Sequence, residues 1–324
     1  MFTYTNLNNQ YNNFYSLDNI KSYGKYPYLK AYIKSYNASV TNQFDTDVSN
    51  EAMMFFKKHY DFLSEGVIEN KYDYYNKNNH KKQIKLNDDT YVIFGDTLNS
   101  MKHIFNFFLT EYCKKIPDDI TISNKTIKNK KWTNADYKIL EDNFDIIFSD
   151  DNIVKTDYAN TILEQFNIFA SLSDTIGNIF PCPPQFNGER SNFGKNDFVD
   201  ILLWSIYKYL SELKEDYLDM LFVGVQDIKR NNGSVYTKRE HISNSKKRLQ
   251  YFLQKYYNNS WDNFVHKNHF EYAINIKNGI CKEPKPLWNG HSISNSDYPE
   301  IGEEFIKMLS NIIIGMIIRN ESFQ

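Results

Sequence analysis

The stretch DFVDILLWSIYKYL, residues 197–210, gives the clearest structural signal in the chain. Apolar residues recur in it at intervals of three and four, which is the spacing of one face of an α-helix. Further apolar residues widen this face until most sides are covered, so the pattern predicts a helix over residues 197–213 that runs through the middle of the fold. The first face consists of Phe198, Leu202, Ile206, Tyr209 and Leu213.

The rest of the chain repeats this helical spacing and adds a little β structure. Residues 84–96, IKLNDDTYVIFGD, alternate as two short strands around a turn-prone triplet, and residues 117–135 are typical of a small hairpin. Residues 1–43 have weak periodicity and are predicted to be loops and short pieces laid over a core. Helices are predicted over residues 49–63, 97–115, 159–172, 243–257 and 261–270, and after Pro299.

These patterns predict a mainly α (α+β) fold, with a compact helical core and a small β-hairpin element. A true α+β sheet is the alternative. No internal repeat and no Gly/Ser-rich or Pro-rich linker divides the sequence. We therefore predict a single domain over residues 1–324. A two-lobed variant would have an N-terminal lobe with the minor β structure, residues 1–150, and a helical lobe, residues 151–324.

Composition supports a folded protein without a strong overall charge. The chain has 324 residues, of which 41% are hydrophobic, and its 25 Tyr and 24 Phe supply ample area for a core. The 38 basic and 40 acidic side chains nearly cancel, so no global field attracts nucleic acid or an acidic membrane. A nucleic-acid contact would have to be local. The basic run of residues 229–248 is the candidate for it, and a solvated surface is the simpler interpretation.

The cysteines and the apolar segments indicate a cytoplasmic protein. Cys113, Cys182 and Cys281 are odd in number, widely spaced and without a CxxC pair, which argues against both a disulfide framework and a zinc site. No stretch of eighteen apolar residues occurs, so no membrane partner is expected. The sequence identifies no cofactor and predicts no metal.

The irregular passage of residues 173–198, SDTIGNIFPCPPQFNGERSNFGKNDF, is the first candidate site. Its prolines force an extended path with unsatisfied carbonyl groups, which Asn178 and Arg190 can serve as donors. Asp200 follows inside the apolar helix, where an unpaired carboxylate would cost several kcal/mol. Arg190 is its nearest plausible partner in the sequence. Such a pair would either pin the passage to the helix or line a pocket that binds an anion.

Two further stretches carry polar residues that suit a binding site. GDTLNS, residues 95–100, lies where a strand meets a helix N-terminus, a place that favours a phosphate or carboxylate. Ordinary capping of the helix by Asp96 or Thr97 is the simpler interpretation of this stretch. His291 lies in the loop LWNGHSISN, residues 287–295, which suggests an exposed histidine with a catalytic or ligand-binding role. No motif of a known reaction occurs, so the sequence leaves open whether the protein is an enzyme.

With these residues in view, the chain resembles a family of bacterial proteins of unknown function, mostly from Firmicutes. The landmarks are FDTD (44–47), GDTLNS, TIGNIFPCPPQFNGERSNFGK running into DFVDILLWSIYKYL, WDNFVHKNHF, GHS and the terminal IIRN. Together they cover most of the chain. The resemblance implies no activity. It implies that Asn178, Arg190, Asp200 and Arg319 belong to one shared arrangement, and that the chain is a complete single unit.

The leading hypothesis is a bacterial protein with one polar pocket that binds a phosphorylated or nucleotide-like ligand. His291 and Arg190 are the predicted catalytic residues, and the predicted ligand-binding residues are Asn178, Asp96, Asn99, Asp200 and Arg319. A role as an effector or toxin in phage defence is part of this hypothesis. The competing class is a non-enzymatic protein-interaction module in which the polar residues are architectural.

Overall fold

The computed structural model has a mainly α architecture with small antiparallel strand pairs, which confirms the predicted fold class. It describes residues 24–37, 50–70, 82–87, 91–113, 121–122, 125–126, 134–148, 158–173, 175–183, 186, 198–222, 227–229, 233–292 and 297–323. The helices are α3 (Pro27–Asn37), α4 (Asn50–His59), α5 (Met101–Cys113), α6 (Asn134–Ile147), α7 (Ala159–Leu172), α9 (Val199–Glu212), α10 (Lys238–Tyr257), α11 (Trp261–Lys267) and α12 (Glu303–Ser322).

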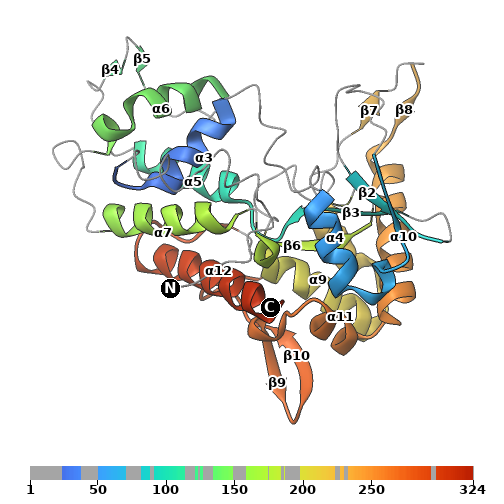
Figure 1. Cartoon of the computed structure of the whole chain (residues 1–324). Helices are drawn as coiled ribbons and strands as arrows, with labels where there is room; N and C mark the ends of the chain where they lie inside the picture. Colours follow the sequence, from blue (N-terminus) through green and yellow to red (C-terminus); the bar gives the residue numbers. More distant parts are fainter. Residues whose placement is uncertain are drawn as a thin grey trace.

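Two groups of helices lie side by side, and α12 runs beneath α7 of the first group toward the second (Figure 1). One group consists of α3, α5, α6 and α7, in which α3 packs on both α6 and α7. The other surrounds a four-stranded sheet and includes α4, α9, α10 and α11. Helix α12 packs on α7 and on the short 3-10 turn Ile176–Asn178, so the C-terminal helix contacts the passage that the sequence singled out.

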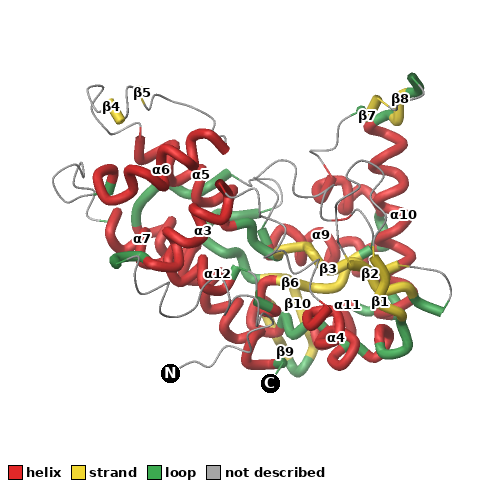
Figure 2. Tube along the Cα trace, turned by 45° about the horizontal axis from the view of Figure 1, so that its top comes forward, coloured by secondary structure: helices red, strands yellow, loops and turns green. Residues whose placement is uncertain are grey.

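The sheet joins distant parts of the chain (Figure 2). Its order is β1 (Val67–Asn70), β2 (Lys82–Lys85), β3 (Tyr91–Thr97) and β6 (Ile179–Cys182), and all neighbours are antiparallel. β6 is the extended path that its prolines predicted, and it pairs with β3 with a register shift between Phe94 and Asp96. Three further pairs are β4 (Thr121–Ile122) with β5 (Lys125–Thr126), β7 (Ile228–Lys229) with β8 (Val235–Tyr236), and β9 (Ile274–Lys277) with β10 (Ile280–Pro284).

The predicted central helix is buried along most of its length. In α9 the residues Ile201, Leu202, Leu203 and Ile206 are completely buried. It packs against β10, α11 and the 3-10 helix Glu215–Phe222. A helix that is apolar on most sides can be stable in water only when its neighbours cover those sides, which is the position found.

Most predicted elements are confirmed, and two predictions are wrong. The helices over 49–63, 97–115, 159–172, 197–213, 243–257 and 261–270, the helix after Pro299, and both strands within 84–96 are all present, with shifted ends. Residues 27–37, predicted as part of a region of loops and short pieces, form the 11-residue helix α3. The second error concerns the start of α5, which begins at Met101 rather than behind a cap at Asp96 or Thr97, because residues 91–97 continue as β3. Helix α6 and the hairpin of β9 and β10 were not predicted.

Among the described residues, the helices are too short or too polar to cross a bilayer. The apolar run IIIGMII of α12 is explained by packing, since Ile312, Ile313 and Met316 are buried.

Candidate functional site

Asn178 and Asn99 form a buried pair that connects residues 175–178, the TIGN passage, to the start of α9. The Asn178 side-chain amide donates to the backbone carbonyls of Asn99 (3.2 Å) and Ser173 (2.9 Å), and its oxygen accepts from the Asn99 N–H (3.1 Å). Asn99 Oδ1 in turn accepts from the N–H of Val199, the first residue of α9 (3.2 Å). Both side chains therefore satisfy backbone groups. By accepting the Val199 N–H, Asn99 satisfies one free N–H at the start of α9, whereas the anion site considered for GDTLNS lies at the start of α5.

Arg319 of α12 is completely buried and serves backbone carbonyls. Its guanidinium donates to the carbonyls of Asn268 (2.9 Å), Ile176 (3.2 Å), Gly177 (2.7 Å) and Ile179 (3.1 Å). The ring of Phe270 lies 4.8 Å from the guanidinium carbon. Burial lowers the pKa of Arg319. Because its guanidinium donates four hydrogen bonds to backbone carbonyls, Arg319 has a structural role.

Asp200 and His291 form a buried pair across 91 positions of sequence. His291 Nδ1 lies 2.5 Å from Asp200 Oδ2, the same oxygen accepts from the Leu287 N–H (2.8 Å), and Oδ1 accepts from the Ile201 N–H (2.9 Å). Because a carboxylate can only accept, the imidazole carries its proton on Nδ1. The need of Asp200 for a partner is thus met by His291. Arg190, the predicted partner, lies outside the described residues.

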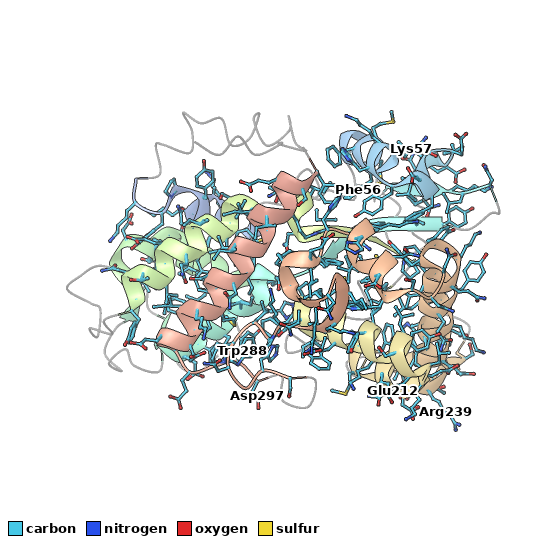
Figure 3. The ribbon with its side chains drawn as sticks, turned by 90° about the horizontal axis from the view of Figure 1, so that it is seen from below. Phe56, Lys57, Glu212, Arg239, Trp288 and Asp297 are labelled. Carbon is cyan, nitrogen blue, oxygen red and sulfur yellow. The ribbon has the colours of Figure 1, made fainter. Side chains whose placement is uncertain are left out.

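His291 is buried, which corrects the prediction of an exposed loop histidine. The residue is 4% exposed, because its ring stacks on Trp288 (centroids 3.4 Å apart) and meets Phe198 edge to face (5.2 Å). In the view from below, Trp288 lies near Asp297 and far from Phe56 and Lys57 of α4 (Figure 3). His291 Nε2 is buried and has no hydrogen-bond partner among the described residues.

These polar residues form a line of neighbours from Arg319 through Asn178 and Asn99 to the Asp200–His291 pair. The chain of contacts runs through backbone groups, and the side chains of Arg319, Asn178 and Asn99 aim at carbonyl and N–H groups. Asp96 contributes its backbone to β3, opposite Phe180. Within the described part of the chain, His291 Nε2 is the fully buried side-chain atom of this line that has no hydrogen-bond partner.

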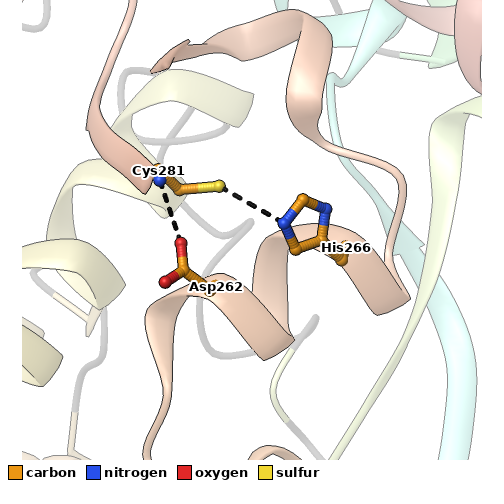
Figure 4. A group of neighbouring side chains, drawn as sticks. All are labelled: Asp262, His266 and Cys281. Carbon is orange, nitrogen blue, oxygen red and sulfur yellow. Dashed lines mark hydrogen bonds between the residues drawn. The ribbon is translucent and has the colours of Figure 1, made fainter. Parts of the chain in front are cut away.

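A second cluster was missed by the sequence analysis. Asp262 and His266, one turn apart on α11, meet Cys281 of β10, and their ligand-type atoms all lie within 4.8 Å of one another (Figure 4). Cys281 Sγ lies 3.8 Å from His266 Nε2, and the Cys281 N–H donates to Asp262 Oδ1 (2.9 Å). The only signal in the sequence was the Asp-x-x-x-His spacing, which places both side chains on one helix face. Cysteine spacing alone does not detect a set that combines one thiol with a carboxylate and an imidazole.

The second cluster also has the order of a thiol nucleophile, a histidine base and an orienting carboxylate, since His266 Nδ1 lies 2.7 Å from Glu271 Oε1. Its electrostatics oppose that role. Burial, and then Asp262 and Glu271, raise the pKa of the Cys281 thiol to about 12. A thiol that stays protonated at neutral pH is a weak nucleophile.

No protein-family model, curated protein or solved structure matches this chain.

Proposed function

We propose that this chain binds a small ligand with a phosphate or another anionic group, and that the Asp200–His291 pair is the centre of that site. The observation that carries the proposal is the buried His291 Nε2 without a partner among the described residues. A buried polar atom left without a hydrogen bond costs about 1–3 kcal/mol, so such an atom is expected to have an occupant.

The chemistry of the ring defines the occupant. With Nδ1–H held by Asp200, a neutral imidazole offers Nε2 as an acceptor, and a protonated imidazole offers it as a donor. A phosphate monoester can match either state, because it carries both hydroxyl and charged oxygen atoms. The aromatic rings of Trp288 and Phe198 exclude water around the imidazole, which strengthens such a contact.

The competing function is protein interaction without catalysis. It is supported by Asn99, Asn178 and Arg319, whose side chains are engaged with backbone groups. In that case an ordered water molecule would occupy the position beside His291 Nε2, and the pair would only pin the segment after β10 to α9. A nucleotide ligand and a role in phage defence stay predictions.

One substitution at His291 separates these functions, and a second is unsuitable because it breaks the bond to Asp200. The amide nitrogen of His291→Asn can replace Nδ1 and keep the bond to Asp200, whereas His291→Gln replaces Nε2 and loses that bond. We expect isothermal titration with inorganic phosphate and with AMP to detect binding to the natural chain. His291→Asn should bind at least about 10-fold more weakly while its melting temperature changes little.

The control is His269→Gln, at a partly buried histidine that contacts Phe323 instead of Asp200. The ligand-binding proposal is wrong if the natural chain binds neither probe. Equal binding by His291→Asn and the natural chain would also contradict it.

A further inference from the structure

The cluster of Asp262, His266 and Cys281 lies apart from the Asp200–His291 pair and is independent of the function proposed for it. We infer that these three side chains bind a divalent transition-metal ion of the zinc class. The donors are a carboxylate oxygen, an imidazole nitrogen and a sulfur. The ion displaces the proton of the Cys281 thiol to solvent, so that sulfur binds as a thiolate. Thiolate and imidazole ligands favour zinc, cobalt, nickel and copper, whereas calcium and magnesium prefer oxygen ligands alone.

The spacing of the donors fits one ion. Zinc binds sulfur at about 2.3 Å and nitrogen at about 2.0–2.1 Å in a tetrahedron, which puts those two ligand atoms about 3.6 Å apart. Cys281 Sγ and His266 Nε2 are 3.8 Å apart before any ion is present. All three donors lie within 4.8 Å of one another, so small side-chain rotations suffice to close the site.

Hydrogen bonds outside the three donors hold this geometry. Glu271 Oε1 lies 2.7 Å from His266 Nδ1, which fixes the proton on Nδ1 and leaves the Nε2 lone pair directed at the cluster. Two more bonds tie α11 to β10: the Cys281 N–H donates to Asp262 Oδ1 (2.9 Å), and the Trp261 indole N–H donates to the Lys282 carbonyl (3.0 Å). The helix and the strand are therefore already aligned for binding.

The site is accessible to an ion from solvent, and its three protein donors leave one coordination position open. The His266 side chain is 54% exposed, whereas Cys281 is buried behind it. Three protein donors leave the fourth position of a tetrahedral ion to water or another exchangeable ligand, as in catalytic rather than structural zinc sites. The Asp262 and Glu271 carboxylates supply negative charge next to the ion.

The test uses Zn²⁺ affinity and the spectrum of Co²⁺, a cation that takes the same ligands. We expect the natural chain to bind one Zn²⁺ per molecule in competition with a chromophoric chelator. Its Co²⁺ form should show an intense sulfur-to-metal charge-transfer band. Cys281→Ser should lose this band and weaken Zn²⁺ binding more than about 100-fold.

Further variants separate loss of a ligand from loss of folding. Asp262→Asn keeps an oxygen that can accept the Cys281 N–H, so it should stay folded by circular dichroism and still bind Zn²⁺ at least 10-fold more weakly. Glu271→Gln, which touches no ion, should weaken binding by about 10–100-fold. Glu283→Gln, an exposed carboxylate on the same strand as Cys281, is the matched control and should bind as the natural chain does.

A control for histidines outside the cluster is His269, whose ring contacts Phe323. His269→Gln should leave the affinity and the charge-transfer band unchanged. The inference is overturned if the natural chain binds no Zn²⁺ at micromolar concentration. It is also overturned if Cys281→Ser binds with the same affinity, or if His269→Gln alone removes binding.

Discussion

Gly177 of the TIGN passage lies so close to α12 that no side chain fits. A Cβ atom at this position would lie 2.1 Å from the Met316 carbonyl oxygen and 2.9 Å from the Asn320 side chain. The Gly177 N–H donates to Asn320 Oδ1 (2.8 Å), and its carbonyl accepts from Arg319. The glycine therefore allows the backbone of the passage to meet two buried polar side chains of the C-terminal helix.

We predict that Gly177→Ala destabilises the protein by about 3 kcal/mol or more, because the backbone of α12 would have to move. The measurement is the free energy of unfolding in urea. Gly302→Ala is the control, since the nearest atom to its Cβ would be 3.9 Å away, and it should cost about 1 kcal/mol or less. Equal losses in the two variants would contradict the close approach.

The polar residues show how far single positions could be predicted. Asp200 was expected to need a partner because of the apolar residues on both sides, and that need is confirmed. The identity of the partner was not predictable, because His291 comes from a segment 91 positions away. Sequence spacing constrains neighbours on one helix, whereas pairs from separate elements depend on how these elements pack.

Helix α10 shows what capping decides at the scale of an element. It begins at Lys238, five residues before the predicted start, because Thr237 and Glu240 form a capping box. The Thr237 hydroxyl accepts from the Glu240 N–H (3.3 Å), and the Glu240 carboxylate accepts from the Thr237 N–H (3.0 Å). The missed start lay in a basic, polar stretch without apolar spacing, so periodicity could not detect it.

Thr237→Ala should lower the free energy of unfolding by about 1 kcal/mol, because it leaves N–H groups at the helix start without acceptors. The free energy of opening of the first turn of α10, measured by amide hydrogen exchange, is expected to fall by the same amount. Ser243→Ala, inside the same helix, should change stability by less than about 0.5 kcal/mol. The capping box would be unimportant if both variants had the same stability.

At the scale of the whole molecule, buried tyrosines make stability depend on alkaline pH. Tyr60 is buried and donates to Asn268, and burial raises its pKa to about 12, against 10.0 for a free tyrosine. Burial also raises the pKa of Tyr257 well above the usual value. The folded state therefore keeps protons that the unfolded chain loses first. The resulting stability is complete below pH 10 and is lost as pH rises from 10 to 12.

We expect the free energy of unfolding to fall between pH 10 and 12, with about 2–3 kcal/mol of that fall due to Tyr60. Tyr60→Phe should be less stable than the natural chain at pH 8, because it lacks the hydrogen bond to Asn268. It should lose less stability than the natural chain between pH 10 and 12. Tyr251→Phe, at an exposed position, should follow the natural chain. A fall of equal size in Tyr60→Phe would show that Tyr60 does not contribute.

The sequence by itself determined the helical class, the apolar central helix, the two strands before α5 and the need of Asp200 for a partner. These features depend on the period of apolar residues and on the cost of burying a charge, which are properties of short segments. Only the tertiary structure decided that Arg319 serves carbonyl groups, that His291 is buried against Asp200, and that Cys281 meets Asp262 and His266. Those contacts join segments far apart in the chain, and packing rather than local spacing brings them together.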